Sequence, residues 1–307
     1  MNEKKKKHKA LKIAGIIIGV LLCAALVAGF ALVQTMNKRV EEQNSVLQKS
    51  DDQLIGERLT IERDGQAPVE GNIYIPDAAG EPLPLMINIH GGAFIAGDAD
   101  SLDTQSDRIS KNNHVVVFTV DYTLLKPIDM ILSSEKKIQY QIDEVCDAVQ
   151  YLTDNADEYH INPDRVIIMG YSAGGHLALG ATNQLIGEGF PVYAQIIGYG
   201  ELGNGIERYN AIPDGRKALC NTLIVFTGTG DFVSESMREY YDLLLENSVP
   251  VSKLEFPNAN HGFLEENNPE YANAEESEGR SPEQETYMHE AEAQITEWLS
   301  GLESANQ

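Results

Sequence analysis

The stretch that decides the fold is Val166-Ile167-Ile168-Met169-Gly170-Tyr171-Ser172-Ala173-Gly174, near the middle of the 307-residue chain. Its apolar, β-branched start predicts a buried strand, and the Ala- and Leu-rich run Ser172–Ile186 predicts a helix. A glycine on each side of the serine suits a sharp turn that brings strand and helix close together. Such a turn exposes the hydroxyl of Ser172 beside a helix N-terminus, which makes it the candidate nucleophile. An ordinary serine-capped helix is the competing interpretation, so Ser172 must be judged by its partners.

Short apolar runs alternate with helix-length segments on both sides of this stretch. Such alternation predicts an α/β fold with a mostly parallel central sheet and helices on both faces. The expected core strands are Leu85–Ile89, Val115–Val120, Val166–Met169, Ala194–Ile197 and Leu223–Phe226. Two earlier runs that alternate in polarity, Arg58–Glu62 and Gly71–Ile75, predict an antiparallel edge. A further helix is expected at 138–152, where apolar residues recur at helical spacing. Two more are expected at Ser236–Leu245 and Glu285–Leu299.

The chain is strongly acidic, with a formal net charge of −24. A negative field of this size repels phosphate backbones, so nucleic acid is not an expected partner. The charge is compatible with a neutral or cationic small-molecule ligand, and equally with a surface that only keeps the protein soluble. Nothing in the composition indicates an oligomeric state.

The first 52 residues differ from the rest of the chain. A basic segment, residues 1–12, precedes an uncharged run, Ile13–Val33, that is long enough to span a bilayer as a helix. The lysines favour a cytoplasmic N-terminus, which predicts a membrane anchor, a polar spacer at 34–52 and an extracytoplasmic catalytic domain at 53–307. The alternative is a cleaved signal sequence ending near Gly29-Phe30-Ala31, which predicts a secreted domain.

The three cysteines do not form a disulfide framework or a metal site. Cys23 lies in the apolar run, and only Cys146 and Cys220 belong to the domain. Both are expected to be buried free thiols, although pairing of the two stays open. No C-x-x-C spacing is present, so no metal is expected.

A glycine-rich loop follows the first core strand, at His90-Gly91-Gly92-Ala93-Phe94. Small residues let backbone N–H groups point at a substrate carbonyl, where each donor stabilises developing negative charge. We therefore expect an oxyanion hole formed by the amides of Gly91, Gly92 and Ala173. His90 is expected to hold the loop by hydrogen bonds.

A serine nucleophile needs a histidine to accept its proton and a carboxylate to orient that histidine. Asp231 follows the strand Leu223–Phe226, and His261 follows the next strand-like run, Val251–Phe256. This order places both side chains at the edge of the sheet that carries Ser172. His176, one turn into the helix after Ser172, is expected to pack or bond locally instead.

Together these motifs resemble the hormone-sensitive-lipase-like and the acetyl- and feruloyl-esterase-like branches of the α/β hydrolases. The resemblance rests on the motifs already quoted and on three further strings, Asp121-Tyr122, Asn162-Pro163-Asp164-Arg165 and Asn260-His261-Gly262-Phe263. It implies the α/β-hydrolase fold and an esterase for short acyl or acetylated substrates that needs no metal or organic cofactor. Ala93 replaces the usual third glycine, and Asp121-Tyr122-Thr123-Leu124 only partly matches its counterpart, which leaves the subfamily and the substrate open.

The leading hypothesis is a serine carboxylesterase that acts on a small-molecule or carbohydrate-linked ester through Ser172, His261 and Asp231. A serine peptidase and an acyltransferase are alternatives, because the same three residues serve amides and alcohol acceptors. A non-catalytic binding module anchored at the membrane is the alternative outside enzymology. Replacement of Ser172 by alanine separates these hypotheses, because it abolishes turnover and spares binding.

Overall fold

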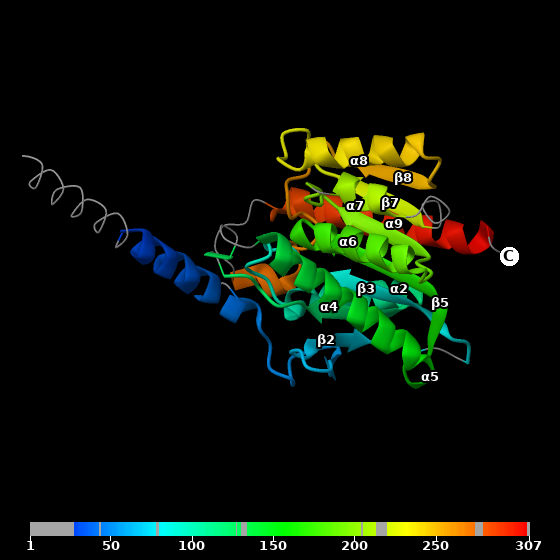
Figure 1. Ribbon diagram of the computed structural model, residues 1–307, viewed down its shortest axis with the longest axis horizontal. Coiled ribbons are helices and arrows are strands. Elements are labelled where there is room, and N and C mark those ends of the chain that lie inside the picture. Colours follow the sequence, from blue (N-terminus) through cyan, green and yellow to red (C-terminus); the bar gives the residue numbers. More distant parts are fainter. Residues whose placement is uncertain are drawn as a thin grey trace, which may run out of the picture.

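The computed structural model describes residues 28–42, 44–77, 80–126, 128–129, 134–203, 205–212, 220–273 and 279–305. At its centre lies an eight-stranded sheet in the order β1-β2-β4-β3-β5-β6-β7-β8 (Figure 1). The strands are β1 (Glu57–Ile61), β2 (Val69–Tyr74), β3 (Leu83–Ile89), β4 (Val116–Asp121), β5 (Ile161–Tyr171), β6 (Ala194–Gly198), β7 (Asn221–Phe226) and β8 (Val251–Glu255).

The pairing of the strands is mostly parallel. The β1–β2 and β2–β4 pairs are antiparallel, and every pair from β4 through β3 and β5 to β8 is parallel. The predicted antiparallel edge and parallel core are both confirmed. The central strands β3 and β6 are buried along almost their whole length, and β5 is buried from Val166 to its end, as expected of strands covered on both faces.

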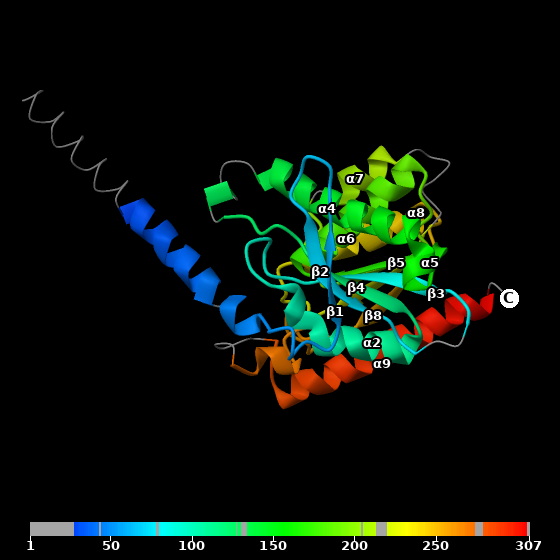
Figure 2. The ribbon, with the colours of Figure 1, turned by 90° about the horizontal axis from the view of Figure 1, so that it is seen from below.

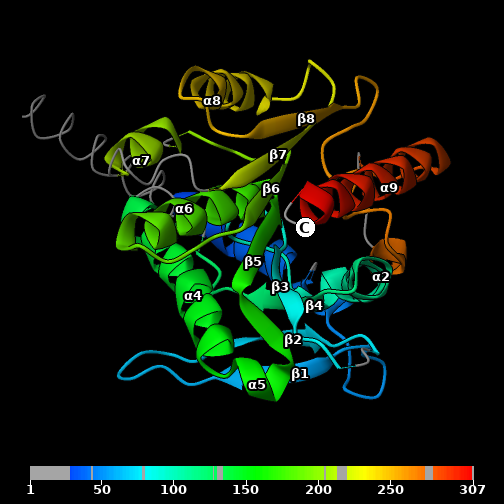
Figure 3. The ribbon, with the colours of Figure 1, turned by 90° about the vertical axis from the view of Figure 1, so that its right-hand side faces the viewer.

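Helices cover both faces of the sheet (Figure 3). On one face lie α4 (Ser134–Asp154), α6 (Ala173–Glu188) and α8 (Ser234–Glu246), and on the other lie α2 (Asp103–Asn113) and α9 (Pro282–Ala305). Short elements complete the set: η1 (Ala99–Leu102), α5 (Ala156–Tyr159), α7 (Gly205–Ala211) and η3 (Pro269–Asn273). The parallel crossovers bring the carboxyl ends of β3, β5, β6, β7 and β8 to one edge, where the loops that carry function are expected.

The helix faces follow from the sequence. In α4 the apolar stripe Ile142, Val145 and Val149 is fully buried. α6 is buried on almost every side, because it lies against both the sheet and α4. Gly180 allows that approach, since a Cβ at this position would lie 2.4 Å from Cδ1 of Ile142.

The sequence did not predict α2, whose residues are mostly polar. Its inward face carries buried polar side chains, among them Asp103, Gln105 and Ser106. Each of them forms hydrogen bonds: Ser106, for example, bonds both Asn88 and Thr119 on the adjacent strands. This helix contacts the sheet through polar side chains, so its sequence shows no helical periodicity of apolar residues.

The N-terminal region is described only from residue 28 onward. Residues 28–42 form a helix that extends away from the domain (Figure 2). Over the described ranges, no helix is both apolar and long enough to cross a membrane. Most of the predicted anchor, Ile13–Val33, lies outside those ranges, so the anchor stays a prediction.

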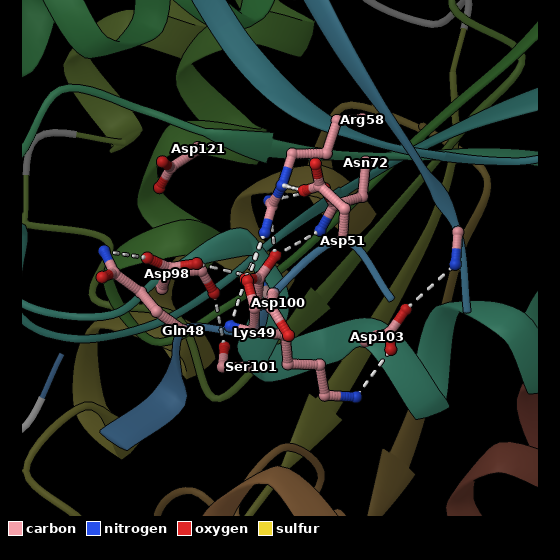
Figure 4. Close-up of polar contacts among 12 residues, drawn as sticks. Gln48, Lys49, Asp51, Arg58, Asn72, Asp98, Asp100, Ser101, Asp103 and Asp121 are labelled. Atoms are coloured by element: carbon pink, nitrogen blue, oxygen red, sulfur yellow. Dashed lines mark hydrogen bonds and ion pairs between the residues drawn. The ribbon is translucent and has the colours of Figure 1, made fainter. Parts of the chain in front are cut away.

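The second half of the predicted polar spacer contacts the catalytic domain. The Gln48 side chain donates to Asp98 at 3.0 Å, and the Lys49 ammonium lies 2.6 Å from Asp103 (Figure 4). The same ammonium lies 2.9 Å from Glu270. Both of these partner carboxylates are almost fully buried. Largely buried ion pairs thus attach this segment to the domain.

Both domain cysteines are buried and unpaired, as predicted. Burial raises the pKa of each thiol, so neither is a reactive thiolate at neutral pH.

Candidate active site

Ser172 occupies the turn between β5 and α6. Its backbone has φ 51° and ψ −117°, a conformation that L-residues rarely adopt. A Cβ at Gly170 would lie 2.2 Å from the carbonyl oxygen of Gly174, and one at Gly174 would lie 2.3 Å from that of Ile89. Both glycines are therefore required for the strand and the helix to meet at this turn, as the sequence indicated.

The structure brings Ser172, His261 and Asp231 together although they are far apart in the chain. His261 Nε2 lies 2.7 Å from Ser172 Oγ, and His261 Nδ1 lies 2.9 Å from Asp231 Oδ2. Because Nδ1 faces a carboxylate, it carries the ring proton, and Nε2 is left as an acceptor for the serine proton. This is the geometry that activation of a serine requires.

Two loops hold the acid and the base in this position. Asp231 lies in the loop after β7, where the hydroxyl of Thr227 donates to its Oδ2 at 2.5 Å. Burial alone would raise the pKa of Asp231, but the hydrogen bonds from His261 and Thr227 outweigh it and lower that pKa. The amide of Gly228 donates to the carbonyl of Ala259 at 3.0 Å, which joins the Asp231 loop to the loop of His261.

The assignment of Gly91 as an oxyanion donor is wrong. Its N–H group donates to Glu265 Oε1 at 3.1 Å in the protein interior, so it does not face Ser172. The next two residues, Gly92 and Ala93, line the same pocket as Ser172. Both have positive φ, 113° and 52°, and this backbone turn directs the loop toward the nucleophile. The amide next to Ser172 is that of Ala173, the first residue of α6.

His90 holds the loop at 90–94 by hydrogen bonding, as predicted. Its Nδ1 donates to the carbonyl of Gly91 at 2.7 Å, and its ring stacks on Tyr122 with centroids 4.3 Å apart. Burial lowers the pKa of His90 to about 4, so the ring is neutral at physiological pH. The Tyr122 hydroxyl also donates to the Gly91 carbonyl, at 3.1 Å.

His176 bonds locally, in agreement with its dismissal as the base. Its Nδ1 lies 2.7 Å from the backbone oxygen of Glu201 and 3.3 Å from that residue's carboxylate. The hydrogen bond from His176 lowers the pKa of Glu201. This pair fixes the segment after β6, whose Glu201 amide donates to the carbonyl of Ser172 at 3.2 Å.

A pocket of about 390 Å³ opens above the nucleophile. Besides Ser172 and His261, its wall includes Val40 from the N-terminal helix and Phe232 from the loop of Asp231. Phe232 is 75% exposed and its ring lies 4.8 Å from that of His261. An apolar side chain this exposed beside a reactive group suits contact with an apolar part of a substrate.

Two carboxyl groups near this edge of the sheet were not among the predicted catalytic residues. Asp121, at the end of β4, has its pKa raised to about 7, chiefly by burial and next by the charge of Asp98. Glu265, four residues after His261, is almost completely buried and lines the pocket. Nothing in the sequence separates Glu265 from its neighbour Glu266, so only the fold reveals its place.

Within the described ranges, no group of three or more His, Cys, Asp or Glu side chains is arranged to hold a metal ion.

Known proteins resemble this chain in sequence. The carboxylesterase NlhH of Mycobacterium tuberculosis is 27% identical over 122 residues, which are 40% of this chain and 36% of that protein. The para-nitrobenzyl esterase of Bacillus subtilis is 29% identical over 109 residues, 34% of this chain and 22% of that enzyme. The chain thus matches about a third or less of the length of these curated relatives.

Solved structures share the fold over most of the chain. An esterase from Pyrobaculum calidifontis superposes with a TM-score of 0.65 at 20% identity, covering 88% of this chain and 93% of the other. EstE1, a carboxylesterase cloned from a metagenomic library, gives a TM-score of 0.63 at 21% identity, covering 87% and 97%. These superpositions confirm the α/β-hydrolase fold.

The family model BD-FAE matches residues 72–246, which are more than half of the chain and carry the oxyanion loop, Ser172 and Asp231. The protein therefore belongs to the BD-FAE family and has the α/β-hydrolase fold.

Proposed function

We propose that the protein is a serine carboxylesterase that hydrolyses short-chain acyl esters through Ser172, His261 and Asp231. The observation that carries this proposal is the continuous hydrogen-bonded line from Ser172 Oγ through both ring nitrogens of His261 to Asp231. The names of the relatives, which are carboxylesterases and esterases, support the same chemistry.

The reaction proceeds in two displacements. His261 Nε2 takes the proton of Ser172 as its oxygen attacks the ester carbonyl, and the carbonyl oxygen becomes an oxyanion. The amides of Gly92, Ala93 and Ala173 stabilise that charge. His261 then gives its proton to the departing alcohol, which leaves Ser172 acylated. A water molecule, deprotonated by His261, releases the acid and restores the serine.

The acyl group is proposed to be small, with acetyl as the leading case. The pocket of about 390 Å³ is near the lower end of the range for small-molecule sites. A compact acyl group fits between the oxyanion loop and Phe232, and the alcohol part then faces the open side. A carbohydrate-linked ester is compatible with such an opening.

We also propose that the enzyme is membrane-anchored and faces away from the cytoplasm. The support is the uncharged run Ile13–Val33 behind a lysine cluster. The helix at 28–42 would then connect this anchor to the pocket, because Val40 is part of the pocket wall.

The test is a panel of p-nitrophenyl esters with the full-length chain. Acetate and butyrate should be hydrolysed and octanoate more slowly, and Ser172→Ala should lower kcat at least about a thousandfold. A folded wild-type protein that cleaves a peptide anilide but no ester would instead favour the peptidase. One that cleaves neither would contradict the proposal.

A further inference from the structure

Glu265 is a buried carboxyl group that the reaction described above does not use. It lies in the turn after His261, is 5% exposed, and yet touches the pocket that holds Ser172. A carboxyl group is costly to bury, so its position requires compensating hydrogen bonds. These hydrogen bonds join Glu265 to Gly91, in the loop that is proposed to stabilise the oxyanion.

The strongest of these contacts is to the backbone of Gly91. The Gly91 amide donates to Glu265 Oε1 at 3.1 Å. The carboxyl group lies against Gly91 so closely that a Cβ at that position would be 2.8 Å from Oε1. The Tyr199 hydroxyl donates to Oε2 at 3.4 Å, and its ring packs edge-on against that of His261.

Gly91 is therefore held from both sides of its backbone. Its N–H group is bound by Glu265, and its carbonyl accepts from His90 and Tyr122. The two residues that follow, Gly92 and Ala93, adopt positive φ and provide the proposed oxyanion donors. A loop with this much backbone strain keeps its shape only if its start is fixed.

We propose that Glu265 is a positioning residue of the oxyanion loop: its carboxyl group binds the Gly91 amide and so aims the amides of Gly92 and Ala93 at Ser172. The inference rests on the proposed esterase function. The Gly91–Glu265 hydrogen bond joins the turn after His261 to the oxyanion loop, two segments separated by more than 160 residues in the chain.

The charge of this group matters as well as its position. Burial, and then the charge of Glu266, raise the pKa of Glu265 to about 8. The carboxyl is thus uncharged at neutral pH, and ionisation above pH 8 would place a negative charge near the oxyanion and oppose its formation. The titratable groups that face it are Tyr122 after β4, Tyr171 on β5, Tyr199 after β6, Tyr271 on η3, and Glu266 and His261 in its own segment.

Two substitutions separate positioning from packing. Glu265→Gln keeps an oxygen acceptor for Gly91 and cannot ionise, whereas Glu265→Leu fills the space without an acceptor. With p-nitrophenyl acetate we expect Glu265→Leu to lower kcat about ten- to a hundredfold while KM changes less than about threefold. Glu265→Gln should keep kcat within about threefold of wild type and should lack the decline in kcat/KM above about pH 8 that we expect for wild type.

Glu270→Leu is the matched control, since it removes another buried carboxyl group away from the pocket. It should lower the melting temperature and leave kcat within about twofold of wild type. Equal kcat in Glu265→Leu and wild type would overturn the inference, and so would an equal loss of kcat in Glu265→Gln and Glu265→Leu.

Amide hydrogen exchange of the peptide that contains Gly91, Gly92 and Ala93 gives a readout that does not depend on turnover. Protection should be retained in Glu265→Gln and lost in Glu265→Leu. If the wild type hydrolyses no ester but this pattern appears, only the esterase proposal fails. If wild type is active and exchange is the same in all variants, only the role of Glu265 fails.

Discussion

Asp231 illustrates how single atoms decide the chemistry. Its two oxygens accept from His261, from Thr227 and, at 3.3 Å, from the amide of Val233. These bonds keep the carboxylate ionised although its side chain is only 4% exposed. An ionised acceptor at this place fixes the proton of His261 on Nδ1.

We predict that Asp231→Asn lowers kcat about a thousandfold or more while KM changes little, because the amide no longer enforces the productive tautomer. Steady-state kinetics with p-nitrophenyl acetate measures this, with circular dichroism as the check on folding. A folded Asp231→Asn variant with near-normal kcat would show that another carboxylate orients His261.

The glycines of the turn yield a stability prediction. A methyl group at Gly174 would meet the carbonyl oxygen of Ile89 at 2.3 Å, so Gly174→Ala should destabilise the fold by about 1–3 kcal/mol. Gly187→Ala is the control in the same helix, since its methyl group meets nothing within 4 Å and should be neutral or stabilising by up to about 1 kcal/mol. Urea unfolding compares the two, and an equal effect would contradict the packing argument.

At the scale of elements, the N-terminal segment is the least expected part of the structure. Only 21% of the Lys49 side chain is exposed, and its ammonium bridges Asp103 at the start of α2 to Glu270 in η3. Asn44 accepts from the amide of Gly97, just beyond the oxyanion loop, at 3.0 Å. The segment is therefore bonded to α2, to η3 and to the backbone at Gly97.

We predict that Lys49→Met destabilises the domain by roughly 2–4 kcal/mol, because it leaves buried carboxylates without their cation. Lys38→Met is the control: Lys38 pairs with Glu42 at 3.2 Å on an exposed surface, where such pairs contribute about 0–1 kcal/mol. Thermal unfolding of both variants decides the matter. If the two melt at the same temperature, the segment is not anchored as described.

The sequence predicted elements well where one physical signal dominated. The buried β-branched runs gave all five predicted core strands, helical spacing gave α4, and the Ala- and Leu-rich composition gave α6. The sequence predicted the helices α8 and α9 as well. It failed for α2, because polar residues face inward there and no apolar period exists. It also misassigned Gly91, because the direction of an amide depends on a partner, Glu265, that only the fold brings near. The contact of Ser172 with His261 was foreseeable because parallel strands bring their ends to one edge.

At the scale of the whole molecule, buried carboxyl groups set the response to pH. The pKa of Asp121 is raised to about 7 and that of Glu265 to about 8, so the native state binds protons that the unfolded chain has released. Between about pH 5 and pH 8 these two groups hold more protons in the native state, so their contribution to stability falls as pH rises. The net charge of −24 adds self-repulsion in the same direction.

We predict a higher melting temperature at pH 6 than at pH 8.5, and a smaller difference in the double variant Asp121→Asn, Glu265→Gln. Differential scanning calorimetry at constant ionic strength measures both. A melting temperature that rises with pH over this interval would mean that neither carboxyl group is protonated in the folded protein.

The proposed reaction requires that Ser172 forms an acyl-enzyme, with His261 as its base. The most direct measurement is peptide mass spectrometry after rapid acid quenching of the full-length chain mixed with p-nitrophenyl acetate. We expect one acetyl group on the peptide that contains Ser172, and its absence in Ser172→Ala. An acetyl group on another residue, or undiminished hydrolysis by a folded Ser172→Ala variant, would contradict this mechanism.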